Sequence, residues 1–321
     1  MRVSFDPAYD DHAVLDAVAA LRAGDRRPAA ALLRETGDDW DRKAHRVGRL
    51  AHDEDCHRTI AEWVAAEPGS ADAHMVNARA LVVQGWAIRG SAYARYVRES
   101  AWSDFFDRLH AADAALSAAM ARAPQDPTPW GIAVLLARGL QVPRTEFERR
   151  WDGLVQRDPA HVTGHYHALQ YLCAKWSGSH AEMFGFAERA SAGAPPGSPL
   201  HALSLFAVIE YAMALTDGRE EGETEALFWK GFQAAQAVDR AVDLWEKPAA
   251  EKGTPPHARA VFDRMHLAFC ASRIGSGAIA ARQFRAMGPY CSDMPWSSFV
   301  ILPRFRTRVH RRLTLAFHRR P

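Results

Sequence analysis

Residues 157–176, RDPAHVTGHYHALQYLCAKW, hold three histidines, a cysteine, two tyrosines and a tryptophan. His161 and His165 are four residues apart, so on a continuous helix they would share one face, as pairs of zinc ligands do. His167 points to a different face, and no carboxylate lies on the shared face within a turn or two. An isolated histidine pair without a third ligand is a weak metal signal, so we predict no metal or cofactor here. We expect His165 to be a packing residue with a ring nitrogen bonded to a backbone carbonyl.

A second cluster of possible ligands is HDEDCH at residues 52–57, with two histidines, three carboxylates and a cysteine. Short polar clusters between apolar-periodic segments are usually turns. We therefore favour an acidic turn in which Asp53 or Asp55 caps the following helix. A metal-dependent protein that uses His161, His165 or this cluster is the least favoured of our interpretations.

Nucleophilic catalysis has little support in the sequence. There is no G-x-S-x-G, no S-x-x-K and no cysteine within a family signature. The glycines of RIGSGAIAAR (273–282) lack the lysine of a phosphate-binding loop. A cofactor-independent enzyme of secondary metabolism, catalysing tailoring or cyclisation in a His/Tyr/Trp-lined pocket, stays the alternative interpretation. Its acid and base groups would be His165, His201, Glu182 and Glu210.

The elements that must position these residues are helices. In DDHAVLDAVAALRAG (10–24), apolar residues recur at steps of three and four, and EFERRWDGLVQRDP (146–159) follows the same rule and ends at a proline. No segment alternates apolar and polar residues over a strand's length, and no hairpin dipeptide occurs. These patterns predict an all-α chain.

The helical segments also repeat. Four prolines each precede, by six positions, a ring residue that opens an apolar helical segment. The pairs are Pro68 and His74, Pro124 and Trp130, Pro159 and His165, and Pro195 and His201. The intervals between the prolines are 56, 35 and 36 residues, and two of them are close to the repeat of about 34 residues in tetratricopeptide proteins. The long first interval has an apparent insertion at 90–103, and the register is also least certain over 216–256.

On these residues the chain resembles the tetratricopeptide-repeat superfamily. Trp130 keeps the ring expected after the repeat proline, and histidine replaces it in the other units. The small residue expected early in the second helix is met by Ala181, whereas Glu146 departs from the pattern. The stretch Lys175, Trp176, Gly178 and Ser179 also resembles a group of uncharacterised actinobacterial proteins, which implies no known activity.

The resemblance implies helical hairpins stacked in a right-handed α-solenoid. We expect N-terminal helices over 1–66, repeats over 67–215, and degenerate repeats with a basic capping helix over 216–321. The first helix of each hairpin would line a concave groove, with each ring residue between the two helices of its own hairpin. The residues implied to line the groove are Arg79, Arg138, Tyr166, Gln170, Cys173, Trp176, Phe206 and Glu210.

That mixed surface suits a peptide, a partner segment or a polar aromatic small molecule. A binding or scaffold protein without chemistry of its own is therefore the favoured interpretation, and whether the chain is an enzyme stays open.

The C-terminal segment 303–321 carries seven arginines, and Phe305, Val309, Leu313 and Phe317 recur every four residues. Such a basic amphipathic helix can lie on an anionic membrane or on nucleic acid. It can also cover the open end of a solenoid, and we favour a cap whose apolar stripe packs on the last repeat.

Bulk composition excludes some partners and compartments. The formal net charge of the 321-residue chain is only +2, so we expect no nucleic acid. The four cysteines contain no C-x-x-C pair, the N-terminus has no secretory pattern, and we find no run of about 18 apolar residues. We expect a cytoplasmic protein without a membrane span.

Overall fold

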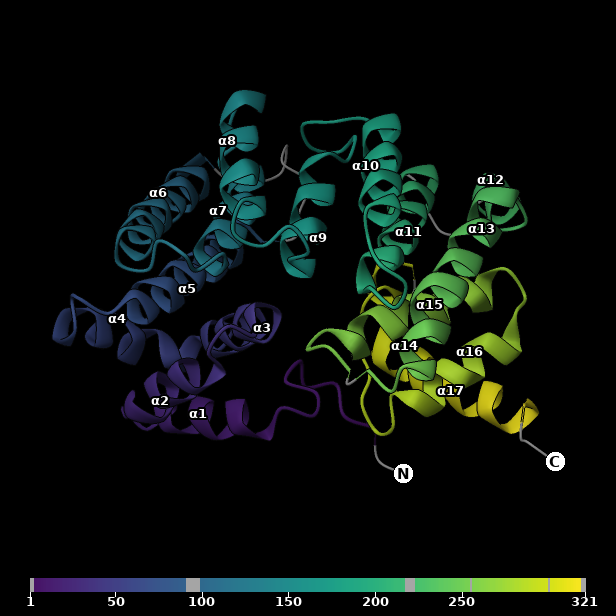
Figure 1. Cartoon of the computed structure of the whole chain (residues 1–321), viewed down its shortest axis with the longest axis horizontal. Helices are drawn as coiled ribbons and strands as arrows, with labels where there is room; N and C mark the ends of the chain where they lie inside the picture. The colour runs from purple at the N-terminus through teal and green to yellow at the C-terminus, as the bar shows by residue number, and fades with distance from the viewer. Residues whose placement is uncertain (1–2, 91–98, 217–222, 255, 300, 319–321) are drawn as a thin grey trace. The chain divides into compact units, whose positions relative to one another are not determined.

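The computed structural model describes residues 3–90, 99–216, 223–254, 256–299 and 301–318 (Figure 1). These residues form helices joined by turns, and among them there is no β-strand, only an isolated parallel bridge between Ser4 and Tyr290. The prediction of an all-α chain is confirmed.

The chain divides into two compact units. Residues 11–171 form one, here the N-terminal unit, and residues 1–10 with 172–321 form the other, here the C-terminal unit. The division at residues 66 and 215 follows the repeat pattern and stays a prediction.

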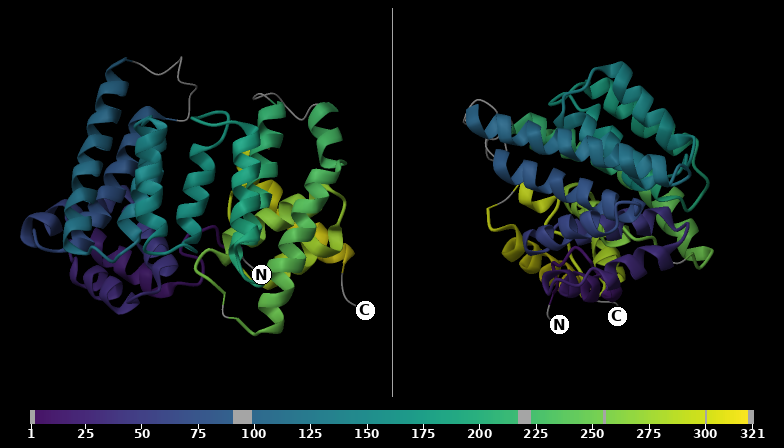
Figure 2. Two further views of the ribbon diagram at one scale, coloured as in Figure 1. Left: turned by 45° about the horizontal axis from the view of Figure 1, so that its top comes forward. Right: turned by 90° about the vertical axis from the view of Figure 1, so that its left-hand side faces the viewer.

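The described residues of the N-terminal unit form α-helices and the short 3₁₀ turn η1. They are α1 (His12–Arg22), α2 (Arg27–Thr36), α3 (Trp40–Ala51), η1 (Glu54–Cys56), α4 (His57–Ala66), α5 (Ala71–Arg89), α6 (Glu99–Arg122), α7 (Thr128–Gly139), α8 (Arg144–Val155) and α9 (Val162–Tyr171). Of the predicted insertion at 90–103, residues 91–98 lie outside the described part, and Glu99 begins α6. Helix α5 packs along α6, and α7 packs against α6, α8 and α9, so that these helices run side by side (Figure 2, left).

Two of the four predicted repeat starts share a hydrogen bond between the ring and the carbonyl oxygen of the repeat proline. The ring Nε2 of His74 lies 2.9 Å from the carbonyl oxygen of Pro68, and that of His201 lies 3.0 Å from the carbonyl oxygen of Pro195. Pro68 and Pro195 lie in the turns before these helices, so their carbonyl oxygens have no partner within the helix, and the ring N–H six residues on satisfies them.

Tryptophan changes this arrangement in the second repeat. Trp130 contacts α8 closely enough that a Cβ on Gly153 would lie 2.1 Å from its ring. The carbonyl oxygen of Pro124 accepts its hydrogen bond from Arg157 Nε instead (2.6 Å), and the Arg157 guanidinium lies over the Trp130 ring at 4.5 Å. The predicted position of Trp130 between the helices of its own hairpin is confirmed.

The imidazoles are placed differently. His165 meets Trp151 of the preceding helix α8 edge-on, with 4.9 Å between ring centroids, and His201 Nδ1 lies 2.8 Å from Ser191 Oγ on the preceding helix α10 (His180–Ala192). Both printed contacts are to the helix that precedes the ring's own hairpin. The position of these two rings between the helices of their own hairpins stays a prediction.

Helix α3 lies across the starts of α5, α7 and α9. Its Lys43 Nζ lies 3.0 Å from Asp72 Oδ1 on α5 and 2.7 Å from Asp126 Oδ2, just before α7. Asp41 accepts the backbone N–H of Val162, the first residue of α9, at 3.0 Å. One helix therefore fixes where three others begin.

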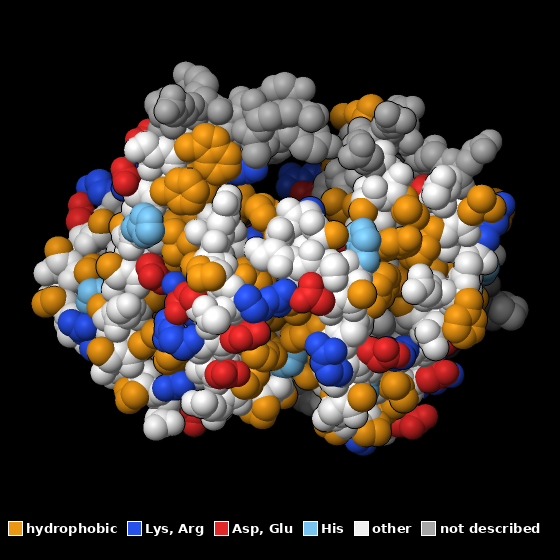
Figure 3. Space-filling model, turned by 90° about the horizontal axis from the view of Figure 1, so that it is seen from above, with side chains coloured by type: hydrophobic (Ala, Val, Ile, Leu, Met, Phe, Trp, Pro, Cys, Tyr) orange, Lys and Arg blue, Asp and Glu red, His pale blue; other side chains and the backbone are white. Residues whose placement is uncertain are grey.

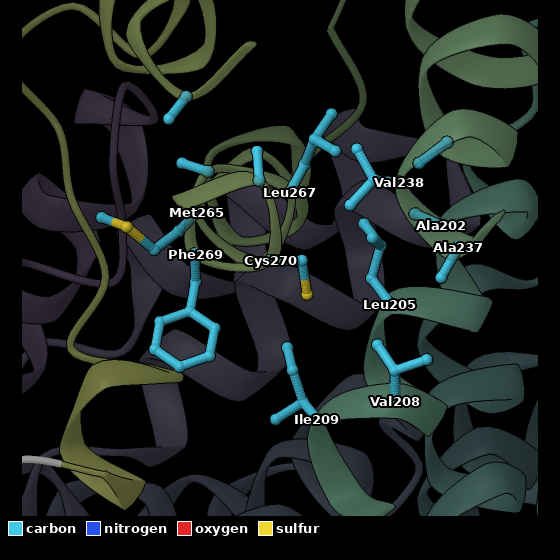
Figure 4. Packing of buried hydrophobic residues seen from close by; sticks show 14 of the residues in the cluster. Ala202, Leu205, Val208, Ile209, Ala237, Val238, Met265, Leu267, Phe269 and Cys270 are labelled. Carbon is cyan, nitrogen blue, oxygen red and sulfur yellow. The ribbon is translucent and has the colours of Figure 1, made fainter. Parts of the chain in front are cut away.

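The C-terminal unit is also helical. Its elements after α10 are η3 (Pro199–Ala202), α11 (Leu203–Thr216), α12 (Glu223–Trp229), α13 (Phe232–Arg240), the π-helical η4 (Ala241–Glu246), α14 (Lys247–Glu251), α15 (Ala260–Arg273), α16 (Gly277–Ala286), η5 (Trp296–Ser298) and α17 (Pro303–Phe317). Its core includes Leu205 and Ile209 of α11, Val238 of α13 and Phe269 of α15 (Figure 4).

One stretch of this unit, Pro199–Thr216, is long and apolar enough to cross a membrane by length and composition, and 67% of it is buried. Our statement that no run reaches that length is therefore wrong. Buried core helices of soluble proteins satisfy the same criterion, so the stretch alone does not assign a membrane span.

Helix α17 is turned the opposite way from our prediction. Its buried residues are Thr307, Arg311 and Thr314, whereas the apolar stripe from Phe305 to Phe317 is exposed. Packing of the stripe as a cap on the last repeat is therefore wrong. Arg311 explains why this side of α17 faces inward. Its guanidinium donates to the carbonyl oxygens of Gly288 and Tyr290, so the buried charge has hydrogen-bond partners. Arg319 and Arg320 lie outside the described residues.

We predict that Gly153→Ala lowers the free energy of unfolding by about 2 kcal/mol, because its Cβ would overlap the Trp130 ring and force repacking. The matched control is Gly48→Ala on α3, where a Cβ meets nothing within 4 Å. This substitution should raise the free energy of unfolding by about 0.5–1 kcal/mol, because alanine favours the helix. Urea unfolding measures both. Equal effects would contradict the position of Trp130.

Candidate functional site

Three of the predicted groove residues come together in the N-terminal unit. Arg79, Arg138 and Gln170 lie on α5, α7 and α9, eight to ten residues after each helix begins. Arg138 Nη1 lies 3.4 Å from Gln170 Oε1, and the charge of Arg138 acts on Arg79. Helix α7 lies beside both α5 and α9, and Gln170 is 4% exposed. That these residues line a groove stays a prediction.

The electrostatics of Arg79 are unusual for an arginine. Burial, together with repulsion from Arg138, lowers the pKa of its guanidinium to about 10. Among the described residues no carboxylate forms an ion pair with Arg79. Arg79 is partly exposed, and a charged group perturbed by burial and by a like charge is of the kind that clusters at functional sites.

Arg150 on α8 shows how this protein treats an arginine that serves the fold. Its side chain is 5% exposed, and it pairs with Glu146 at 2.7 Å and with Asp113 at 3.1 Å. Nη1 also donates to the carbonyl oxygen of Ala133 at 3.1 Å. The charge of Arg150 is therefore balanced by two carboxylates and a carbonyl oxygen, whereas no carboxylate pairs with Arg79 among the described residues.

Aromatic rings surround the arginines of this site, and we did not predict them. The Arg138 guanidinium lies 5.6 Å from the Trp86 ring centroid, and Arg89 lies 5.3 Å from Trp86 and 5.4 Å from Trp102 on α6. A Cβ on Gly139 would lie 2.7 Å from Leu109 Cδ1, so the missing side chain lets α7 approach α6 closely beside the Trp86 ring. The three-residue step from Trp86 to Arg89 was the available signal, since it places both on one side of α5.

The other predicted groove residues have separate surroundings. Tyr166 is partly exposed on α9, and its ring centroid lies 5.6 Å from that of His167. In the C-terminal unit Trp176 is partly exposed, and Glu210 pairs with Lys175.

Two further members of the predicted groove are packing residues. Cys173 is 2% exposed, with Sγ 3.4 Å from the sulfur of Met183. Phe206 is 4% exposed, stacks on Phe262 with 5.7 Å between ring centroids, and lies tilted against His266 at 4.3 Å. We predicted that Cys173 and Phe206 face an open groove, and this is wrong. The apolar character of α11 around Phe206 extends around the whole helix, so position alone could not give its direction.

The histidines proposed for acid–base chemistry are part of the packing. His165 is 5% exposed, its Nδ1 donates to the carbonyl oxygen of His161 at 3.0 Å, and burial lowers its pKa to about 4. This confirms the expected bond from His165 to a backbone carbonyl. Burial also lowers the pKa of His201. Both rings are therefore neutral at neutral pH and held by neighbours that favour a structural role.

The carboxylates of that alternative have local partners. Ser179 caps α10 by accepting the backbone N–H of Glu182 at 3.1 Å, and Ser179 Oγ lies 3.1 Å from Glu182 Oε2. The ion pair of Glu210 with Lys175 gives that carboxylate a cationic partner.

The two suspected metal clusters have structural roles. His161 Nδ1 accepts the backbone N–H of Gly164 at 3.0 Å and so caps α9. In the 52–57 cluster, Asp53 accepts the N–H of Asp55 and pairs with Arg22, which confirms the predicted acidic cap. Burial raises the pKa of the Cys56 thiol to about 11. No group of three or more His, Cys, Asp or Glu in the described part of the chain could hold a metal ion.

A shallow cavity of about 290 Å³ lies elsewhere in the N-terminal unit, between α2, α3 and the turn before α7. Its lining includes Trp40, Lys43 and Asp126. Burial alone would lower the pKa of Lys43, but Asp126 and Asp72 outweigh it and raise the pKa above the usual value. The charged groups of this cavity are thus neutralised within the fold, unlike Arg79.

We predict that Arg79→Met raises the free energy of unfolding by about 1 kcal/mol, because it removes a desolvated charge and its repulsion with Arg138. Arg150→Met is the matched comparison and should lower it by about 3 kcal/mol, since it breaks the buried ion pairs with Glu146 and Asp113 and removes the donor to the Ala133 carbonyl oxygen. Chemical unfolding of both variants tests this. A loss for Arg79→Met as large as for Arg150→Met would mean that Arg79 serves the fold.

Comparison of the chain with protein-family models, with curated proteins and with solved structures finds no match. The candidate site therefore rests on the geometry of its own residues.

Proposed function

We propose that the chain is a binding or scaffold protein. In this proposal its helices form a tetratricopeptide-like, right-handed α-solenoid, and the face lined by α5, α7 and α9 takes a peptide or partner segment. The pairing of α7 with α8, the side-by-side packing of α7 and α9, and the ring residue after each repeat proline support the repeat architecture.

The observation that carries the proposal is the pair of guanidiniums at Arg79 and Arg138. A carboxylate placed between them would offset both the desolvation of Arg79 and the repulsion between the two charges. Arginine suits this role because its planar fork donates two parallel hydrogen bonds to a carboxylate. The proposed ligand is therefore an acidic segment.

The neighbouring rings indicate what lies beside the acidic residue. Trp86 contacts both Arg138 and Arg89, Trp102 contacts Arg89, and Tyr166 adds a phenol on α9. Aromatic and arginine side chains are the residues that contribute most to binding at protein interfaces. An extended peptide with an Asp or Glu next to an apolar residue fits both features, and a carboxylate-bearing aromatic small molecule fits less of the face.

Charge elsewhere favours a peptide over nucleic acid. Basic and acidic side chains are interspersed with apolar ones on the surface coloured in Figure 3, and the net charge is only +2. Nucleic-acid binding proteins instead concentrate positive charge along one face. We propose a cytoplasmic protein that needs no cofactor for this binding.

The test is selection from a phage-displayed library of random peptides on the immobilised full chain, followed by fluorescence anisotropy of the enriched peptides. We predict that they carry Asp or Glu and that Arg79→Gln raises their Kd at least tenfold, because a charge-assisted hydrogen bond is lost.

Arg122→Gln on α6 is the matched control, since this exposed arginine donates only within its own helix, to the carbonyl oxygen of Ala118. It should leave Kd unchanged. Peptides that lack acidic residues, or that bind Arg79→Gln and wild type equally well, would contradict the proposal, as would failure to enrich any peptide.

A further inference from the structure

Helix α17 presents a continuous apolar stripe to solvent. Phe305 is 63% exposed, Val309 41%, Leu313 53% and Phe317 83%. Residues four apart lie one above the other on a helix, so these four side chains form one row. Single exposed apolar residues are ordinary, whereas a row of large ones on a folded surface indicates an interaction site.

The row extends beyond the helix start. Ile301 and Leu302, directly before Pro303, are 73% and 68% exposed. Together with the helical residues they make up the apolar stripe of α17, six large side chains within 17 residues. A helix of 15 residues is about 22 Å long, which gives the stripe the reach of a surface-lying amphipathic helix.

The helix is prevented from turning this stripe inward. On its buried side Arg311 donates to the Tyr290 carbonyl oxygen at 3.2 Å, and His310 Nε2 lies 2.8 Å from Ser272 Oγ on α15. Thr307 is completely buried. Rolling the helix would break these bonds and leave a guanidinium buried without partners, so the outward direction of the stripe is part of the fold.

Positive charge accompanies the stripe. Arg306 and Arg312 are exposed beside it, and among the described residues no carboxylate pairs with either. Arg308 is exposed and lies over the Phe5 ring at 5.0 Å, whereas Arg304 pairs with Asp293. Residues 303–321 contain no Asp or Glu.

We propose that α17 binds the surface of a membrane that contains anionic lipids. The stripe enters the boundary between headgroups and acyl chains, and the arginines contact lipid phosphates. A second copy of this chain is a poorer occupant, because pairing two stripes would bring the arginines of both helices together without an acidic residue on either. Nucleic acid would satisfy the arginines but leave the six apolar side chains in water.

This surface belongs to the C-terminal unit and does not depend on the proposed peptide site. The two inferences are compatible with one cytoplasmic protein, since the cytoplasmic leaflet carries the anionic lipids that attract basic helices.

The test is co-sedimentation of the full chain with vesicles of phosphatidylcholine alone or with one third phosphatidylglycerol. Wild type should bind the anionic vesicles, and added salt should weaken binding. The double variant Phe305→Ser/Leu313→Ser should bind at least tenfold less to them. The double variant Arg306→Gln/Arg312→Gln should bind anionic vesicles about tenfold more weakly than wild type, with no change in binding to phosphatidylcholine vesicles.

Phe232→Ser is the matched control, because Phe232 is 77% exposed at the start of α13 and lies outside the stripe. It should bind like wild type. Each variant should unfold at the wild-type temperature, since only exposed side chains are changed.

A second readout does not depend on removing the stripe. All four native cysteines are buried, so Leu313→Cys can be labelled selectively with an environment-sensitive dye. Its emission should shift to shorter wavelength with anionic vesicles, whereas dye on Phe232→Cys should not respond.

Three results would overturn the proposal. One is absence of wild-type binding to anionic vesicles, and another is equal binding by Phe305→Ser/Leu313→Ser. The third is a wild-type dimer in sedimentation equilibrium that the same double variant converts to a monomer, together with no vesicle binding, which would assign the stripe to a second copy of the chain.

Discussion

The contact on which the N-terminal unit depends is the ammonium group of Lys43 held between the carboxylates of Asp72 and Asp126. Taking these charges out of water is costly, and the arrangement is stable because one cation faces two anions at hydrogen-bond distance. The cluster joins α3 to the starts of α5 and α7. Asp41 joins α3 to the start of α9, because its carboxylate accepts the backbone N–H of Val162. The starts of α5, α7 and α9 are thereby aligned with one another. Side chains two to three turns further along each helix then lie on one face.

Arg79 and Arg138 lie on that face, and the contrast with Lys43 is informative. At Lys43 the fold supplies the opposite charges, and the pKa of the ammonium group rises. At Arg79 the fold supplies another positive charge, and the pKa of the guanidinium falls. Stability alone does not favour the second arrangement, and the negatively charged ligand of the proposed function would offset it. The Arg79→Met and Arg150→Met pair separates these two uses of arginine.

Helices and repeat starts were predictable because they follow from local rules. A proline followed six residues later by a ring identified where α5, α7 and α9 begin, and the register placed Arg79, Arg138 and Gln170 together. The direction in which a side chain faces was harder to predict. The four-residue period of α17 showed that a stripe exists, but whether it packs inward depends on hydrogen bonds of Arg311 to the distant Gly288–Cys291 turn. The direction of the histidine rings and the burial of Phe206 likewise depend on partners from other helices. The solenoid and its ligand stay proposals that the local pattern supports.

The central claim is that a carboxylate binds at Arg79, and charge reversal tests it most directly. Binding is measured between the full chain carrying Arg79→Glu and a selected peptide whose acidic residue is replaced by lysine. The account predicts that either reversal alone raises Kd at least tenfold and that the two together recover most of the lost affinity, because the ion pair is restored with its signs exchanged. If the doubly reversed pair binds no better than the single reversals, the carboxylate does not contact Arg79 and the proposed binding face is wrong.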